Sequence, residues 1–280
     1  MISINSQDWY AWIAALLWPL VRILGMITAS PVLGNRTFPA RAKVLLGLAL
    51  TLLIAPLLPP LPASIKDPLS LNGMLILAQQ FLIGIGIGLS MRIVFAAVEM
   101  AGESIGLTMG LGFATFFDPQ SQGRSSAIAQ FLALLATLSF LAIDGHLLMI
   151  QIVVETFITL PISDQPVSAY GFKLLADWGA KLFSAGLQLA LPILCALLLV
   201  NIALGILTRA APQLNIFGIG FPLTLGLGFL MLTLILPYLS MPLQTLLNQG
   251  FEQAREVPRK LQQREPRPPA PAPALPAARP

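Results

Sequence analysis

Long apolar runs follow one another along most of the chain, with short polar stretches between them. Six are present, covering roughly residues 9–33, 43–61, 72–98, 127–160, 174–208 and 215–247. A helix needs about 20 apolar residues to cross the hydrocarbon core of a bilayer, and each run approaches or exceeds that length. Since backbone in lipid must satisfy its own hydrogen bonds, the pattern predicts an all-α membrane protein with about six long apolar segments.

Several of these runs contain residues that break a regular helix. The fourth is interrupted by IDGH, at Asp144 to His146. The fifth and sixth contain Pro192, Pro222 and Pro237, and proline removes a backbone donor from a helix interior. We therefore expect kinked helices and helical hairpins. His146 is the single histidine, so it is interpreted as a structural polar group at the break and not as a proton relay.

Composition supports the membrane class and singles out the C-terminus. Only 10% of the 280 residues are charged and 56% are hydrophobic, whereas soluble domains are about 25% charged. The formal charge of +4 comes from the end of the chain: residues 255–280 carry six basic and two acidic side chains, whereas residues 1–254 carry ten of each. Eight of the last 23 residues are proline, a composition that buries little surface.

These features divide the chain into a helical membrane domain over 1–250 and a basic, Pro/Ala-rich, disordered tail over 251–280. We expect the tail to lie on the cytoplasmic side, near anionic lipid or an acidic partner, and not to bind nucleic acid. Because such a tail contributes nothing to a fold, removing the residues after about Arg255 should leave membrane insertion and complex formation intact.

The charges of the loops conflict with a simple topology. Six crossings would place both termini on one side, and the basic tail indicates the cytoplasm. The first loop, with Arg36, Arg41 and Lys43, would then lie outside. Either one apolar segment is not a simple crossing, or the protein is not an ordinary lipid-embedded bundle.

One helix face in and after the third run carries charge where lipid would be expected. At 100° per residue, Arg92, Glu99 and Glu103 fall within about 20° of one direction. A charge facing lipid at mid-bilayer costs roughly 2.5–3.5 kcal/mol, so this face should meet protein or water. Glycines repeat every four residues beside it: Gly102, Gly106 and Gly110. Such spacing lets another backbone approach closely. The set is either a packed interface with a buried ion pair or a face that lines a hydrated path.

The loop GFATFFDPQSQGRSS, residues 112–126, separates two apolar runs. Its aromatic residues are Phe113, Phe116 and Phe117, and Asp118 and Pro119 follow them. Pro119 and Gly123 would leave backbone groups unpaired in lipid, so the loop must be covered by protein or face a water-filled cavity. The phenylalanines either pack the loop onto its own helices or fill space and exclude water.

Signatures of catalysis are missing from the sequence. It contains no HExxH, GxSxG or Walker loop, and neither an enzyme nor a cofactor or metal is expected. Cys195 is the single cysteine and is interpreted as a buried hydrophobic residue. A secondary transporter acting alone remains an alternative, which predicts an internal inverted repeat. An intramembrane enzyme is a further alternative, and it predicts converging His, Cys or acidic residues.

Three stretches carry a resemblance to a known family: PVLGNRTFPARAKVLLGLALT, GLGFATFFDPQSQ and NIALGILTRAAPQLNIFGIGFPLTL. With them, most of residues 9–250 resembles the FliR family of flagellar export-gate membrane proteins, which has a counterpart in injectisome type III secretion. The third stretch contains the tight turn of a helical hairpin, with Arg209, Pro212 and Gln213.

The resemblance implies a non-enzymatic subunit of the flagellar protein export gate in the bacterial inner membrane, within the basal body. It implies the partners FliP, FliQ, FlhB and FlhA and unfolded export substrates. It also implies a FliP-like portion followed by a FliQ-like hairpin, much of it raised above the membrane plane. That position would resolve the conflict of the loop charges. The loop over residues 112–124 matches the loop of the family that is thought to plug the closed gate.

Overall fold

The computed structural model describes residues 6–35, 37–58, 68, 70–113, 126–211 and 216–263. The helices are α1 (Ser6–Ala29), α2 (Ala40–Ile54), α3 (Leu71–Thr108), α5 (Ala127–Ala142), α6 (Gly145–Thr159), α7 (Ala169–Ala210), α8 (Ile216–Ile235) and α9 (Ser240–Gln262). Short 3₁₀ turns are η1 (Ala55–Leu57), η3 (Leu111–Phe113) and η5 (Leu236–Tyr238). No strand occurs within these ranges, and the predicted all-α fold is confirmed.

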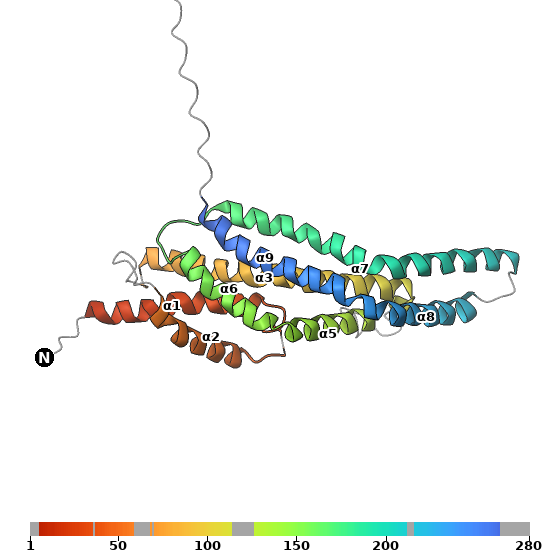
Figure 1. Ribbon diagram of the computed structural model, residues 1–280, viewed down its shortest axis with the longest axis horizontal. Coiled ribbons are helices and arrows are strands. Elements are labelled where there is room, and N and C mark those ends of the chain that lie inside the picture. Colours follow the sequence, from red (N-terminus) through yellow and green to blue (C-terminus); the bar gives the residue numbers. More distant parts are fainter. Residues whose placement is uncertain are drawn as a thin grey trace, which may run out of the picture.

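Helix α3 is the axis of an elongated bundle (Figure 1). It packs against α1, α5, α7 and α9, and 67% of its most apolar stretch is buried inside the protein. At 1.5 Å per residue its 38 residues span about 57 Å. Figure 1 shows α2 toward one end of the bundle and the α7–α8 hairpin at the opposite end.

Helices α1 and α3 run in the same direction and approach at glycines. A Cβ at Gly84 would meet the backbone of Arg22 and Met26. One turn on, a Cβ at Gly88 would lie 2.6 Å from the carbonyl oxygen of Met26 and 2.7 Å from the Cβ of Ala29. Helix α1 ends at Ala29, beside Gly88, well before the end of α3 at Thr108.

The predicted break in the fourth apolar run is present. Asp144 adopts a left-handed conformation with φ of 55°, and α5 and α6 meet there at 64°. His146 follows in the first turn of α6, and its Nδ1 is buried without a hydrogen-bond partner among the described residues. The prediction of a structural polar group at this break remains a prediction.

The prolines lie at or near the expected interruptions. Pro192 is inside α7 and Pro222 is inside α8. Pro237 lies in η5, which separates α8 from α9. The sixth apolar run is therefore two helices, and the second continues well past the run.

The expected boundary of a disordered tail at residue 251 is wrong for residues 251–262. Helix α9 continues to Gln262, with Phe251, Ala254, Val257 and Leu261 buried. The backbone N–H of Ser168 also donates to the carbonyl oxygen of Leu261, at 2.9 Å. Apolar positions three and four residues apart keep one stripe in the core although most residues between them are polar. A cut after Arg255 would remove part of that stripe, which argues against the expectation that such a cut is harmless. Residues 264–280 lie outside the described part.

The membrane-protein class is supported helix by helix. Within the described ranges, four helices are long and apolar enough to cross a bilayer, and the bent α5–α6 pair could form a fifth span. The apolar part of α1, Ile13–Ala29, is shorter. The six apolar runs all contain helix, but they are not six equivalent spans.

Candidate functional site

The loop predicted as a plug starts where α3 ends. Gly110 has φ of 87°, a conformation that glycine adopts at little cost and that terminates a helix. Gly110 is therefore part of the helix end and does not extend a helical stripe. Phe113 is the last residue of η3, and nothing is described of its side chain. The other loop residues proposed from sequence lie outside the described part: Phe116, Phe117, Asp118 and Pro119.

The first end of this loop is attached to α8. The hydroxyl of Thr224 donates to the carbonyl oxygen of Met109 at 3.3 Å, and it also faces the carbonyl oxygen of Phe221 at 3.1 Å. Met109 is fully buried. A Cβ at Gly228 would lie 2.6 Å from the Cγ of Met109, so α8 fits closely over this residue.

The second end of the loop is attached to α3. The backbone N–H of Ser126 donates to Oε2 of Glu103 at 2.8 Å, and the Ser126 hydroxyl accepts from the N–H of Ala129 at 3.2 Å. Ser126 thereby caps α5, and the Glu103 carboxylate lies at the positive end of that helix. Both ends of the loop are thus held beside the last turns of α3.

The charged face predicted on α3 divides into two parts. Glu103 is partly buried and bonded to Ser126, whereas Arg92 and Glu99 are exposed. Neither Arg92 nor Glu99 forms an ion pair with a described residue, so the buried ion pair that we considered is not found. Their exposure follows from the shorter α1, which ends beside Gly88.

The glycines of this face pack against the chain itself. A Cβ at Gly102 would meet the backbone of Ala129. A Cβ at Gly106 would lie 2.8 Å from the Oγ of Ser126. The close approach expected from the four-residue spacing is therefore present, and the approaching backbone is the start of α5.

Sequence reasoning missed a polar cluster around Arg22, which is fully buried between α1, α3 and α6. Its Nε donates to Oε1 of Gln80 at 2.7 Å. One terminal nitrogen donates to the carbonyl oxygen and the hydroxyl of Thr156 at 3.0 and 3.1 Å. The other terminal nitrogen donates to the carbonyl oxygen of Leu160 at 3.0 Å. The guanidinium carbon also lies 4.3 Å from the ring centroid of Phe157.

No carboxylate of the described residues is within ion-pair distance of this guanidinium. Its charge is stabilised by neutral acceptors and an aromatic ring, which is the fixed, planar recognition that arginine provides. The position of Arg22 inside an apolar run could have predicted this cluster, because a charged residue there usually faces other protein groups and not lipid. The cluster fastens three helices together.

Comparison with known proteins assigns the family. The profile of the bacterial export proteins, family 1, matches residues 13–250. The chain belongs to this family. Relatives described as flagellar biosynthetic protein FliR come from Pectobacterium carotovorum subsp. carotovorum and Escherichia coli strain K12. They are 45% and 41% identical over 257 residues, which cover 92% of this chain and 97% of each relative.

A FliR relative from Bacillus subtilis strain 168 is 30% identical over 251 residues, covering 87% of this chain and 94% of the relative. The predicted resemblance to the FliR family is therefore confirmed over most of the chain. With several candidate spans, this export-family chain is a multi-pass membrane protein. Within the described residues no group of three or more His, Cys, Asp or Glu side chains could hold a metal ion.

Of the predicted hairpin turn between α7 and α8, only the residues on the α7 side are described. Arg209 lies exposed in the last turn of α7, where its positive charge complements the negative end of the helix. Pro212 and Gln213 lie outside the described residues. Cys195, expected to be buried, is exposed on α7.

Proposed function

We propose that the chain is a non-enzymatic subunit of the flagellar type III protein export gate, which forms the export channel together with FliP and FliQ. In this proposal it works beside FlhB and FlhA in the inner membrane at the flagellar basal body and passes unfolded substrates. The part up to α6 is FliP-like, and the α7–α8 hairpin is the FliQ-like portion. Family membership over residues 13–250 supports this role.

The distribution of exposed apolar side chains carries the proposal of a multi-subunit assembly. At one end they include Leu45 and Leu53 on α2, which are 65% and 71% exposed. At the other end they include Leu199 on α7 and Phe229 on α8, which are 69% and 51% exposed. These surfaces lie toward opposite ends of a bundle (Figure 1) whose central helix alone spans about 57 Å. A bilayer core covers about 30 Å, so other protein subunits must cover part of this surface.

The exposed pair on α3 marks one place where such a subunit would sit. Arg92 and Glu99 lie on the face that α1 leaves open beyond Gly88. Opposite charges seven residues apart require charged or polar partners, because each is costly against lipid. We assign this face to a neighbouring subunit or to the hydrated channel.

The aromatic loop over residues 112–124 is proposed as the plug of the closed gate. A plug has to exclude ions at rest and yield to an unfolded substrate, and a short aromatic loop suits both tasks. Its support is the anchoring of both ends beside α3, through Met109 and Thr224 and through Glu103 and Ser126. Fixed ends keep the loop attached to the bundle on both sides.

Co-purification tests the proposed assembly. An affinity-tagged chain is expressed with FliP and FliQ from the same bacterium, extracted in mild detergent and isolated by the tag. We expect both partners to elute with it in fixed ratio, and the same gene to restore motility to a strain that lacks its own copy. A chain that elutes alone, is stable and moves a small solute in vesicles would instead be a transporter or channel acting alone, and the proposal would fail.

A further inference from the structure

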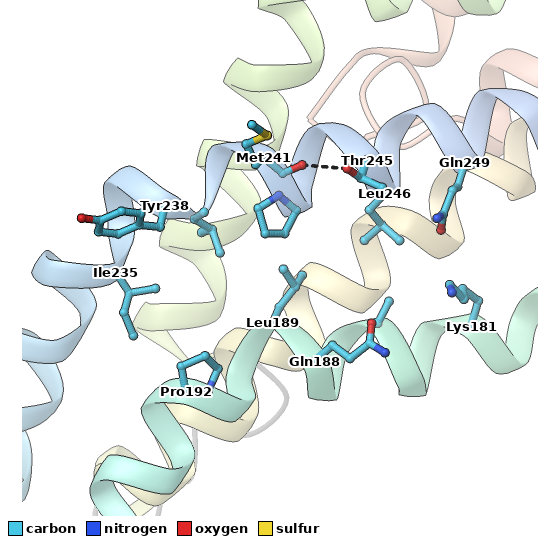
Figure 2. A pocket seen from close by; sticks show the side chains of 13 residues that line it. Lys181, Gln188, Leu189, Pro192, Ile235, Tyr238, Met241, Thr245, Leu246 and Gln249 are labelled. Carbon is cyan, nitrogen blue, oxygen red and sulfur yellow. Dashed lines mark hydrogen bonds between the residues drawn. The ribbon is translucent and has the colours of Figure 1, made fainter.

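A groove of about 580 Å³ runs between α7, η5 and α9 (Figure 2). Its walls come from two segments distant in sequence: α7 around Leu189, and the stretch from Ile235 to Gln249. Helices α7 and α9 pack against each other, and α7 also packs against α8. The groove is therefore formed by the tertiary structure, and its volume falls in the range typical of small-molecule sites, about 300–1,000 Å³.

Polar groups gather at one end of the groove. Lys181, Gln188 and Gln249 lie together there, and Tyr238 lies at the other end (Figure 2). Among the described residues, no carboxylate pairs with Lys181. This end therefore offers a cation and two amides to an anionic group that is not part of the described chain.

The remainder of the groove is apolar. It is lined by leucine, isoleucine and proline side chains that include Leu189, Pro192, Ile235, Leu239 and Leu246. The hydroxyl of Thr245 at the wall already donates to the carbonyl oxygen of Met241 at 3.0 Å. Between its two polar ends the wall consequently offers few side-chain groups to an extended peptide, whose backbone would need hydrogen bonds. A hydrocarbon chain needs none.

A cation and two amides at one end, with apolar side chains along the rest, match an amphiphile that has an anionic head and a hydrocarbon tail. We infer that the groove binds an acidic phospholipid, with its phosphate at Lys181, Gln188 and Gln249 and an acyl chain along Leu189 and Leu246. This site goes beyond the proposed role in export and does not depend on it.

The lipid retained by the purified protein tests this inference. Wild type and Lys181→Gln are isolated in mild detergent and delipidated. They are then reconstituted with an equal mixture of phosphatidylglycerol and phosphatidylethanolamine, and the retained lipid is measured by mass spectrometry. We expect wild type to retain phosphatidylglycerol preferentially and Lys181→Gln to lose about fivefold, as for one cationic side chain at an anionic headgroup. The control is Lys173→Gln, an exposed lysine two turns earlier on α7 and outside the groove, which should retain as much as wild type.

A second variant tests whether the groove itself holds the lipid. Gln188 is exposed at the groove wall, and Gln188→Trp removes one of the two amides and fills the groove, so it should reduce retention of both lipids while the protein remains folded. Equal retention of the two lipids by wild type, or equal loss in both lysine variants, would overturn the inference. So would cross-linking of a peptide, and not of lipid, to a photoreactive residue at position 188.

Discussion

The hydroxyl of Thr224 on α8 lies 3.3 Å from the carbonyl oxygen of Met109, at the end of α3. The two residues are separated by 115 positions in sequence. Met109 immediately precedes the positive-φ glycine that leads into the aromatic loop. This hydrogen bond couples the α7–α8 hairpin to the base of the loop.

If the loop is the plug, the bond should help to hold it closed. Thr224→Val removes the hydroxyl with little change of shape, and a hydrogen bond of this kind is worth about 1 kcal/mol. We expect the assembly to form normally and its ion leak to rise several-fold, measured as flux in vesicles. Thr233→Val is the matched control, because Thr233 is exposed and its hydroxyl bonds only to Phe229 of its own helix, at 2.8 Å. Equal ion leak in the two variants would show that the Thr224 hydrogen bond does not help to close the gate.

The loop itself is tested by removing its aromatic side chains. Phe113, Phe116 and Phe117 are changed together to alanine, or residues 112–122 are deleted. Because the anchors at Met109 and Ser126 remain, the complex should assemble with FliP and FliQ but conduct ions or small solutes at rest. Flux across vesicles that contain the assembly is the measurement. A mutant assembly as tight as wild type would remove the plug assignment.

A side chain at position 106 should destabilise the protein, because it would collide with Ser126 of the same chain. A Cβ there would lie 2.8 Å from the Oγ of Ser126, so Gly106→Leu should push the start of α5 away from α3. Overpacking of this kind costs about 1–3 kcal/mol, which we expect as a lower Tm of the purified chain even without partners. Gly226→Leu is the control, since a Cβ at Gly226 meets nothing within 4 Å. If the isolated Gly106→Leu chain had a normal Tm but no longer assembled, Gly106 would instead lie at an interface with another subunit.

Arg22 should tolerate methionine better than lysine. Lysine keeps a buried charge but cannot reproduce the planar set of donors to Gln80, Thr156 and Leu160. We expect Arg22→Lys to lower the free energy of unfolding by roughly 2–4 kcal/mol and Arg22→Met by less, because methionine buries no charge, although it leaves the Gln80 side-chain oxygen and the Leu160 carbonyl oxygen without this donor. Apparent Tm in detergent ranks the variants. Arg41→Met, at an exposed position on α2, provides the baseline, and a lysine variant as stable as wild type would contradict the argument.

Truncation of the C-terminus should destabilise the protein only when it removes part of α9, which ends at Gln262. A chain ending after Arg255 loses the buried side chains of Val257 and Leu261, and full burial of such a side chain contributes about 1.5–3 kcal/mol. We expect that cut to lower Tm and the yield of folded protein, whereas a cut after Gln263 should change neither. Loss of stability with the cut after Gln263 as well would give residues 264–280 a structural role.

The sequence predicted those features that depend on neighbouring residues. The helical fold follows from the length of the apolar runs, and the bend between α5 and α6 from Asp144 and Gly145, whereas Gly110, predicted on a helix face, in fact lies just past the end of α3. The fold and the bend each depend on residues a few positions apart. The predicted domain boundary at residue 250 was wrong, although the pattern that predicts α9 also lies in neighbouring residues. The polar average composition hid the apolar spacing of Phe251, Ala254, Val257 and Leu261.

Only the tertiary structure decided which elements meet. The spacing of Gly102 and Gly106 determined that a backbone approaches α3, but not that it is the start of α5, more than 20 residues later. Arg22 reaches Gln80 across 58 positions and Thr156 across 134. The amphiphilic groove joins residues from α7, η5 and α9. Such contacts arise when whole helices pack together, and the contacts leave no periodic pattern in the sequence. An apolar stripe shows that a helix face is buried, but it does not identify the helix that covers it.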